Sequence, residues 1–415
     1  MQILREVVPL RARSGIAYLR AFNHEDAGVR MATPMDLIAV TGTNGKTSVV
    51  SYAQQILQAC GTPAASYGSL GISTADGTEP DPELPPDDQT IPALVQQLEG
   101  VAEVLIFEAT SFALARGILD RLRIRTGVFT NLSHDHLDVH GGSMSVYLGA
   151  KSRLFTDILP TSGTAILGDD DASQVIAEHL TGRGMVPVRV GHGGDIVLIG
   201  CTGDPAAGSV LTFDVRGEAF EVGLPFTTGF QATNLLFALA IVTELGVSTE
   251  EAARSLAQIE HPPGRFEVIS QAAGVTLIVD YAHNPNALAV ALRSARELTR
   301  GRVGVVFGCG GERDRDKRAP MGRIAGQFAD VVVVTDDNPR REDPTAIRHH
   351  ILDACPNAAE VPDRQQAVEE ALQQLEAGDV LVLAGRGDER FQEIGDERVA
   401  SSDRYLLTQL LQGER

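Results

Sequence analysis

The chain has 415 residues, of which 43% are hydrophobic, enough for two or three domains with apolar cores. Its formal net charge of −20 argues against nucleic acid or an anionic membrane surface as a partner. The sequence has neither a long apolar run typical of a membrane span nor a signal peptide at its N-terminus, so we expect a cytoplasmic protein that acts on small molecules, as a monomer or weak homodimer.

Apolar runs alternate with amphipathic patterns along the chain, which predicts the α/β fold class. The expected strands are 36–41, 103–109, 126–130, 163–168, 277–281, 303–308, 331–335 and 379–384. The expected helices are 47–60, 90–99, 231–245, 249–257, 286–299, 345–354 and 364–376.

Two segments interrupt this alternation. Residues 76–88 form a proline-rich acidic stretch that fits neither a helix nor a central strand. Residues 261–265, His-Pro-Pro-Gly-Arg, follow an expected helix and precede a strand-rich region, which indicates a linker between domains.

A glycine-rich turn follows the first expected strand, because residues 39–48 read AVTGTNGKTS. A strand, a glycine turn and a helix N-terminus together direct backbone N–H groups and a positive helix end at an anion. Lys46 is placed to reach terminal phosphates and Thr47 to hold Mg²⁺, although Val40 replaces the first glycine of the full P-loop pattern. The segment predicts an ATP site formed by Gly42, Thr43, Asn44, Gly45, Lys46, Thr47 and Ser48.

Two further polar segments follow strands, where open α/β sheets bind ligands. Glu108 ends one strand, although a lone glutamate there is more often a solvated loop residue. Residues 130–141, TNLSHDHLDVHG, contain three histidines and two aspartates, too many for a core. Oxygen ligands with one imidazole suit Mg²⁺ or Mn²⁺, and a zinc site is conceivable. A helix with Lys151 on the same side as Tyr147 comes next.

These segments, in this order, resemble the Mur ligase superfamily from about residue 36 to about residue 404. Within it, the chain is most similar to the ligases that add a diamino acid to UDP-N-acetylmuramoyl-dipeptide. Further collinear matches are FQATN at 230–234, PGRFE at 263–267, DYAHNP at 280–285, GCGGERD at 308–314, DNPR at 337–340 and SDR at 402–404.

The resemblance implies a short segment 1–35, a central P-loop ATPase domain with a mainly parallel sheet at 36–262, and a Rossmann-like C-terminal domain at 263–415. It implies amide formation through an acyl phosphate, with ATP and two Mg²⁺ ions. The implied catalytic residues are Lys46, Glu108, His136 and Lys151. The implied metal ligands are Thr47, Glu108, His136 and Lys151, and the further nucleotide contacts are Asn234, Arg265, Asp280 and His283.

Lys151 looks like the carbamylated lysine of this superfamily. Addition of CO₂ turns its ammonium into a carboxylate that is attracted to two metal ions rather than repelled by them. A surface lysine paired with a neighbouring acid is the alternative.

The resemblance also places the incoming amino acid, with Arg340 as a bidentate clamp on its distal carboxylate. A simple turn after the strand at 331–335 is the alternative for residues 337–340. The implied substrate-binding residues are Ser111, Arg313, Asp337, Asn338, Arg340, Gly385 and Glu389.

The chain departs from the superfamily where the acceptor is recognised. Residues 1–35 are too few for a uridine-binding domain of about a hundred residues. Phe112 replaces a histidine, Ile118 replaces an arginine that contacts the sugar acceptor, and residues 385–389 read GRGDE instead of GKGHE. We therefore expect an acceptor other than the full UDP-sugar peptide, in a specialised pathway.

Three alternatives remain: a genuine peptidoglycan precursor ligase adding diaminopimelate, a folylpolyglutamate-synthase-like ligase, and a non-catalytic scaffold. Residues 134–140 and 337–340 argue against the folate ligase. Retention of the four implied catalytic residues argues against a scaffold.

Overall fold

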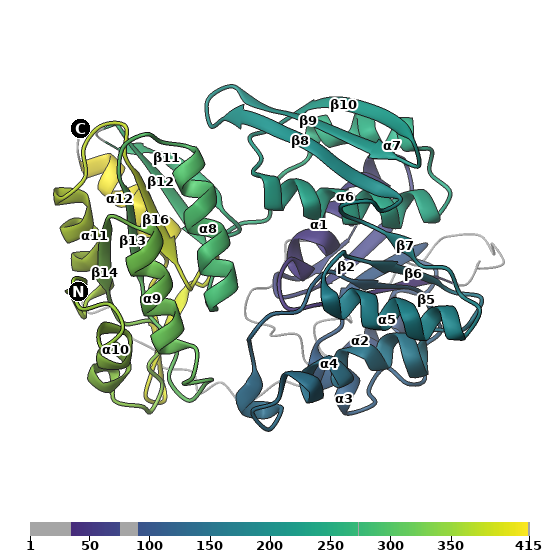
Figure 1. The fold of residues 1–415 in the computed structure, drawn as a ribbon, viewed down its shortest axis with the longest axis horizontal. Helices are drawn as coiled ribbons and strands as arrows, with labels where there is room; N and C mark the ends of the chain where they lie inside the picture. Colours follow the sequence, from purple (N-terminus) through teal and green to yellow (C-terminus); the bar gives the residue numbers. More distant parts are fainter. Residues whose placement is uncertain (1–34, 75–89, 273, 414–415) are drawn as a thin grey trace, which may run out of the picture.

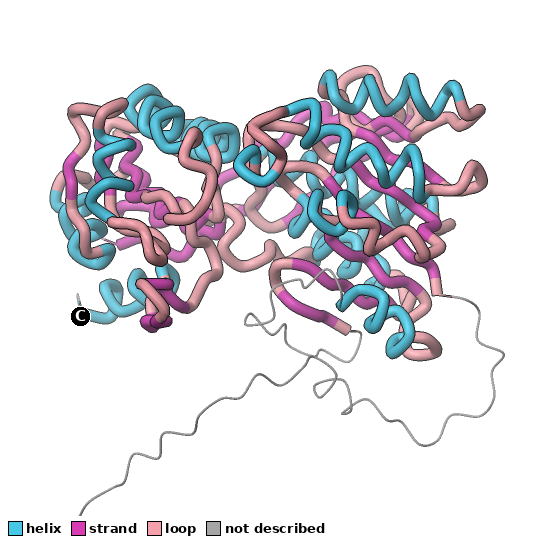
Figure 2. Tube along the Cα trace, turned by 90° about the horizontal axis from the view of Figure 1, so that it is seen from below, coloured by secondary structure: helices cyan, strands magenta, loops and turns pink. Residues whose placement is uncertain are grey.

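The structure is a computed structural model, and residues 35–74, 90–272 and 274–413 are described. The acidic loop expected at 76–88 and nearly all of the expected N-terminal segment lie outside these residues. Figures 1 and 2 show two parts side by side, one holding the elements up to α7 and the other those from β11 onward.

The first part is built on a seven-stranded sheet whose order departs from chain order. Across the sheet the strands are β3 (Gly71–Ser73), β2 (Ala64–Gly68), β4 (Val104–Glu108), β1 (Asp36–Thr41), β5 (Ile124–Phe129), β6 (Thr164–Leu167) and β7 (Val188–Arg189). Neighbouring strands are parallel except β2 with β3. The register pairs Val40 with both Glu108 and Val128, so the loops after β1, β4 and β5 meet at one edge.

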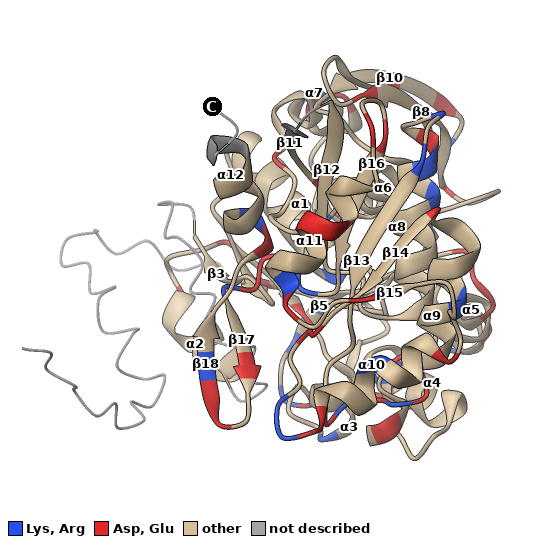
Figure 3. Cartoon of the chain, turned by 90° about the vertical axis from the view of Figure 1, so that its left-hand side faces the viewer, with Lys and Arg blue, Asp and Glu red and all other residues tan. Residues whose placement is uncertain are grey.

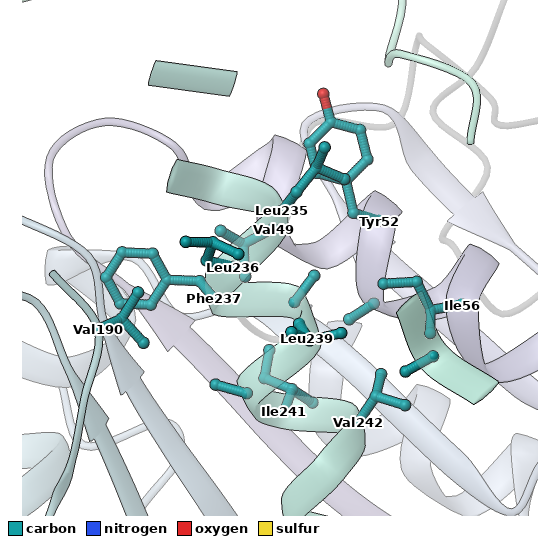
Figure 4. Close-up of a cluster of buried hydrophobic side chains, with 14 of the residues drawn as sticks. Val49, Tyr52, Ile56, Val190, Leu235, Leu236, Phe237, Leu239, Ile241 and Val242 are labelled. Carbon is teal, nitrogen blue, oxygen red and sulfur yellow. The ribbon is translucent and has the colours of Figure 1, made fainter. Parts of the chain in front are cut away.

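Helices cover both faces of this sheet because successive residues of β1 point to opposite sides. Ile38 and Val40 pack with α1 (Lys46–Ala59) and α6 (Gly229–Glu244), as Figure 4 shows for the α1 and α6 side chains. Leu37 and Ala39 belong to the core on the other face. That face is covered by α2 (Thr90–Leu98), α3 (Ser111–Ala115) and α5 (Asp171–Gly182).

Two further helices of this part each end in a turn of another helical type. Helix α4 (Met144–Arg153) continues into the π-helical turn η3 (Leu154–Ile158), and α7 (Thr249–Ser255) continues into the 3₁₀ turn η4 (Leu256–Gln258). Another 3₁₀ turn, η2 (Leu137–Val139), lies in the histidine-rich segment.

A small antiparallel sheet lies against α6 and η4. Its strands are β8 (Ile196–Asp204), β9 (Gly208–Val215) and β10 (Glu218–Leu224), in the order β10-β9-β8. Leu211 and Phe213 of β9 join the core around α6. The sequence does not predict these strands because the apolar residues of β8 and β9 lack a regular alternation, with Ile199 and Val210 exposed while Leu211 and Phe213 are buried.

The second part is built on a six-stranded sheet. In spatial order the strands are β11 (Glu267–Ala272), β12 (Val275–Asp280), β16 (Val380–Ala384), β13 (Val303–Phe307), β14 (Val331–Val334) and β15 (Ala359–Glu360). Only the β11–β12 pairing within this sheet is antiparallel among the described residues. A hairpin of β17 (Phe391–Ile394) and β18 (Glu397–Ala400) stands beside it.

Helices also cover both faces of the second sheet. One face packs on α8 (Pro285–Glu297), α9 (Arg318–Phe328) and α10 (Pro344–Leu352). The other packs on α11 (Arg364–Gln373) and α12 (Asp403–Gly413). None of the helices in the described ranges combines the length and apolar character that a bilayer crossing requires.

The structure confirms every strand and helix expected from the sequence, with ends shifted by at most three residues. The elements that the sequence did not predict include the short strands β3, β7, β15, β17 and β18, and also the helices α5, α9 and α12, which have 11 or 12 residues. The expected linker at 261–265 lies between η4 and β11, where the chain passes from one set of sheets to the other. The domain limits drawn there stay a prediction.

Candidate active site between the two sheets

The glycine-rich turn between β1 and α1 takes a backbone shape that needs glycine. Gly42 has φ 140° and Gly45 has φ 87°, a region that side chains disfavour. A Cβ on Gly42 would lie 2.0 Å from Thr130 Oγ1, and one on Gly45 would lie 2.5 Å from Asn234 Oδ1. The turn is therefore packed directly against the exit of β5 and against α6.

Hydrogen bonds to residues after β5 hold the turn in place. The N–H groups of Thr43 and Asn44 donate to the backbone oxygen and side-chain Oδ1 of Asn131, at 2.8 and 3.1 Å. The oxygen of Asn44 accepts from Thr130 Oγ1 at 2.7 Å and from Asn131 Nδ2 at 3.0 Å. These two N–H groups donate within the protein, whereas the N–H groups in the first turn of α1 have no carbonyl partner within the helix and can donate to an anion.

Two lysines converge on the same turn. Lys46 Nζ donates to the oxygens of Gly42 and Thr43 at 3.0 and 2.8 Å, and Lys151 Nζ donates to the Gly42 oxygen at 2.7 Å. Lys151 is only 2% exposed and lies 4.7 Å from the centre of the Tyr147 ring, which confirms that the two residues share a helix face. Desolvation lowers the pKa of both lysines, and the charge of Lys46 lowers the pKa of Lys151 further.

Glu108 lies at the end of β4, beside the first turn of α1. Its Oε1 accepts hydrogen bonds from Thr47 Oγ1 at 2.9 Å and from the N–H of Ser69 at 2.8 Å. A Cβ on Gly68 would lie 2.3 Å from Oε1, so the glycine makes room for the carboxylate. Glu108 is thus a buried, positioned group rather than a solvated loop residue.

A third cluster joins the two parts of the molecule. The ligand atoms of Asp135, His136 and His283 lie within 4.8 Å of one another. His283 Nε2 is 3.3 Å from Asp135 Oδ2 while its Nδ1 is 2.8 Å from the backbone oxygen of Tyr281, which orients the ring toward the carboxylate. Asn284 Nδ2 also donates to Asp135 Oδ2, at 3.3 Å.

The surroundings of this cluster favour an ionised Asp135 carboxylate and a neutral His136 imidazole, which are the forms that bind a metal ion. Burial alone would raise the pKa of Asp135, but His283, His136 and Lys317 outweigh it and hold the pKa well below its usual range. Burial lowers the pKa of His136 to about 4, so its imidazole is neutral near pH 7. The family resemblance implies His136 as a ligand and His283 as a nucleotide contact, whereas nothing in the sequence singled out Asp135. Only the approach of β12 to the histidine-rich segment brings the three together.

A cavity of about 460 Å³ lies between the turn and the second sheet. Of the residues predicted from sequence, its lining contains Thr43, Asn44, Gly45, Lys46, Thr47, Ser48, Glu108, His136, Asn234, Arg265, Asp280 and His283. Phe230, Phe237 and Val290 add apolar wall that the sequence did not reveal. Gly42, which belongs to the turn, and Lys151 are not among the lining residues, and they contact each other through the hydrogen bond from Lys151 Nζ to the Gly42 oxygen.

Two predicted nucleotide contacts already have partners within the second part. Arg265 Nη1 is 2.9 Å from Asp388 Oδ1, and its guanidinium carbon lies 4.3 Å from the centre of the Tyr281 ring. Asp280 accepts from the N–H groups of Phe266 and Ala282 at 2.7 and 2.8 Å, and burial raises its pKa to about 6. Both residues reach the cavity, and Asp280 also braces the loop after β12.

A second group of predicted residues meets at the carboxyl ends of β14 and β16. Asn338 Nδ2 donates to Glu389 Oε2 at 2.7 Å, and a Cβ on Gly385 would lie 2.9 Å from Asp337 Oδ2. Arg313 and Arg340 both lie beside Gly310, whose added Cβ would be 3.6 Å from Arg313 Cγ and 3.0 Å from Arg340 Nη1.

Charge is concentrated in this group. Burial, together with the charge of Asp337, raises the pKa of Glu389 to about 7. Arg340 has φ 52° and pairs with Glu393, a residue that the sequence analysis did not include.

Ser111 lies elsewhere than the other predicted substrate residues. It begins α3, and its Oγ is 2.9 Å from His140 Nε2. The Phe112 ring lies 6.0 Å from that of His136 and 5.8 Å from that of His140, while Ile118 packs on the apolar core below α3.

Known proteins match both parts of the chain. The family model described as the Mur ligase middle domain matches residues 40–242, and that of the Mur ligase glutamate ligase domain matches residues 264–387. UDP-N-acetylmuramoyl-L-alanyl-D-glutamate–2,6-diaminopimelate ligase of Brucella melitensis is 40% identical over 89% of this chain and 76% of its own.

Solved structures agree with this likeness. A structure of a ligase of that same name aligns with a TM-score of 0.63 and 29% identity, over 92% of this chain and 79% of its own. Mycobacterium tuberculosis folylpolyglutamate synthase complexed with ADP aligns with a TM-score of 0.66 over 85% of this chain and 88% of its own, and at 20% identity it shows the fold alone.

Proposed function

The chain belongs to the Mur ligase family and is an ATP-dependent amide-forming ligase, and from this premise we propose that it joins a diamino acid to a small carboxylate acceptor. The cavity carries the proposal, since one wall is the glycine-rich turn and the other is Arg265, Tyr281 and His283 of the second part. A nucleotide bound there would touch both parts.

The proposed reaction has two steps. An oxygen of the acceptor carboxylate attacks the γ-phosphorus of ATP, and ADP leaves with the bridging oxygen. The unprotonated amine then attacks the acyl carbon, phosphate leaves with the electron pair of the C–O bond, and the nitrogen releases one proton to solvent. The first turn of α1 and Lys46 bind the phosphates, because both supply positive charge where the transferring group is anionic.

The donor groups at the site fit divalent metal ions. Thr47 and Glu108 offer a hydroxyl and a carboxylate in contact, and the Asp135 cluster offers a carboxylate and two imidazoles. The oxygen pair of Thr47 and Glu108 suits Mg²⁺ or Mn²⁺, and the Asp135 cluster, with two imidazoles, accepts Mn²⁺ as well. We propose that these residues hold two ions, which when bound neutralise charge on the phosphates.

Lys151 fits the proposed carbamate. Its amine is buried, and burial together with the charge of Lys46 lowers its pKa well below the usual value, which favours the neutral form that attacks CO₂. A new N–C bond forms and one proton leaves. The resulting carboxylate would lie among Lys46, the Gly42 turn and the proposed metal ligands.

We call the group at the carboxyl ends of β14 and β16 the amine pocket; it consists of Arg313, Asp337, Asn338, Arg340, Gly385 and Glu389. This group supports a diamino acid with a carboxylate at its distal end. Arg340 offers a guanidinium for the carboxylate, and Asn338 and Glu389 offer groups for the amine. The relatives named above are diaminopimelate ligases, which makes diaminopimelate the first amine to test.

The residues near α3 support an acceptor smaller than a UDP-sugar peptide. Phe112 faces the two histidines with an aromatic ring, and Ile118 packs against the apolar core while half-buried, so neither side chain offers a charge or hydrogen bond to a sugar nucleotide. The names of the relatives favour UDP-N-acetylmuramoyl-L-alanyl-D-glutamate as the second candidate.

The test is phosphate release with diaminopimelate and ATP, comparing L-alanyl-D-glutamate and other small carboxylates with the UDP-sugar dipeptide, and with product masses measured. We expect turnover with a small carboxylate and weak or no turnover with the nucleotide. Efficient use of the nucleotide would refute the acceptor proposal and leave the ligase chemistry in place.

A further inference from the structure

The β17–β18 hairpin forms one wall of the amine pocket through backbone contacts. The N–H of Arg340 donates to the Glu393 oxygen at 3.0 Å, and the N–H of Gly395 donates to the Arg340 oxygen at 2.7 Å. Asn338 Oδ1 accepts from the N–H of Glu393 at 2.9 Å. The position of Glu393 relative to Arg340 is therefore set by the main chain.

A buried arginine fixes the base of the same hairpin. Arg386 is fully buried, and its Nη2 donates to the oxygens of Phe391 and Ser401 at 2.7 and 2.9 Å. The hairpin is thus tied at both its base and its middle. Figure 3 shows acidic residues on both of its strands.

The side chain of Glu393 occupies one edge of the Arg340 guanidinium. Its Oε2 lies 2.8 Å from Arg340 Nε, and Arg340 Nη1 donates to the Gly311 oxygen at 2.9 Å. A bidentate carboxylate uses two parallel N–H groups of a guanidinium, and the edge that includes Nε is already paired. Arg340 is 19% exposed and Glu393 is 35% exposed, so both side chains are accessible from solvent.

We propose that Glu393 is a specificity-determining residue, which weakens the preference of this pocket for amino acids with a distal carboxylate. The proposal rests on the proposed function, which gives Arg340 the role of binding the incoming amino acid. An entering carboxylate must displace Glu393 or bind beside its negative charge, and both reduce affinity.

A distal ammonium group, unlike a distal carboxylate, is attracted to the negative charge of Glu393. It can approach the Glu393 carboxylate directly, with Asp337 as a further acidic residue at the same end of the sheet. Glu393 therefore acts on a distal carboxylate through Arg340 and on a distal ammonium directly, and both effects bring the affinities for the two classes of diamino acid closer together. A residue that only braced the hairpin would change stability and leave the ratio of these affinities unchanged.

The test uses Glu393→Gln, which keeps the shape of the side chain and removes its charge. Asp396→Asn is the matched control, because Asp396 lies in the turn of the same hairpin and pairs with Arg341. Dissociation constants for diaminopimelate and for lysine are measured by calorimetry on the full chain with ADP present.

We expect Glu393→Gln to raise the preference for diaminopimelate over lysine about five-fold, the size of effect typical of a half-exposed ion pair. Asp396→Asn should leave the ratio as in the unmodified chain. An unchanged or reduced ratio in Glu393→Gln, an equal change in the control, or no binding of either amino acid would overturn the proposal.

Two further measurements keep the result clear. If Glu393→Gln does not fold, Glu393→Ala is measured in the same way with the same expected direction. Phosphate release is followed separately, because a shifted binding ratio without turnover would support the role of Glu393 while refuting the proposed function.

Discussion

The glycine-rich turn and the amine pocket are built in opposite ways. The turn is one contiguous segment whose shape comes from Gly42 and Gly45 and whose position comes from backbone bonds to Asn131. The amine pocket gathers side chains from separate loops, and its main charge, Arg340, is paired with Glu393. Phosphate binding at the turn thus depends on backbone geometry. The choice of amino acid in the amine pocket depends on which side chains are already paired with each other.

This difference has a consequence for substitution. A change in the turn alters geometry that all nucleotides share. A change in the pocket alters a balance of charges, so its effect differs from one amino acid to another.

The largest effect is expected at Lys151, beneath the turn. Lys151→Ala removes the proposed carbamate and should abolish measurable ligation, a loss of about a thousand-fold or more. Single-turnover phosphate release and product masses measure it, and added short-chain carboxylates should restore part of the activity. Full activity in this variant would show that the metals need no ligand at this position.

Arg340 tests the amine pocket. Arg340→Ala should cost about 2–5 kcal/mol in transition-state binding for a carboxylate-ended amino acid, and Arg340→Lys should restore little because an ammonium lacks the planar fork. The loss should appear in the amino-acid KM and kcat/KM, with the KM for ATP nearly unchanged. Since Arg340 also donates to the Gly311 oxygen, Tm is measured on the same variant. A fall in Tm with unaltered amino-acid selectivity would show that Arg340 only stabilises the loop after β14 and does not bind the amino acid.

Gly45 tests the geometry of the turn. Gly45→Ala adds about 1–2 kcal/mol of backbone strain and pushes on Asn234 in the cavity wall, so the KM for ATP should rise about ten-fold. Gly61→Ala is the control, because Gly61 also has positive φ, at 79°, while its Cβ would meet nothing within 4 Å. Both should lower Tm, and only Gly45→Ala should affect ATP. If the two variants have the same KM for ATP, Asn234 does not take part in nucleotide binding.

The smallest effect concerns pH. The pKa of Glu389 is raised from 4.5 to about 7, so the folded protein keeps a proton that the unfolded chain has lost in this window. The free energy of unfolding contributed by Glu389 therefore falls as pH rises from about 4.5 to about 7. Because the side chain is 33% exposed, the change should be below about 1 kcal/mol. Denaturation curves of Glu389→Gln should show a weaker fall with pH, and a slope equal to that of the unmodified chain would contradict the raised pKa.

The sequence by itself determined the α/β class, the long buried strands and the family. Residues 41–47 were sufficient for the turn, because its glycines, lysine and threonine act within a few residues of one another. The family resemblance is confirmed, whereas the roles of individual residues, the oligomeric state and the domain limits stay predictions.

Only the tertiary structure decided which distant groups meet. Asp135 and His283 are 148 positions apart, and Arg340 and Glu393 are 53 positions apart, so no local pattern links them. The half-buried sheet of β8–β10 was not predicted for a related reason, because its apolar residues are buried only where they pack on the core around α6. The conformation of a turn depends on contiguous residues and can therefore be predicted from sequence. The pairing of distant charges depends on how the sheets bring loop ends together, which is a property of the whole fold.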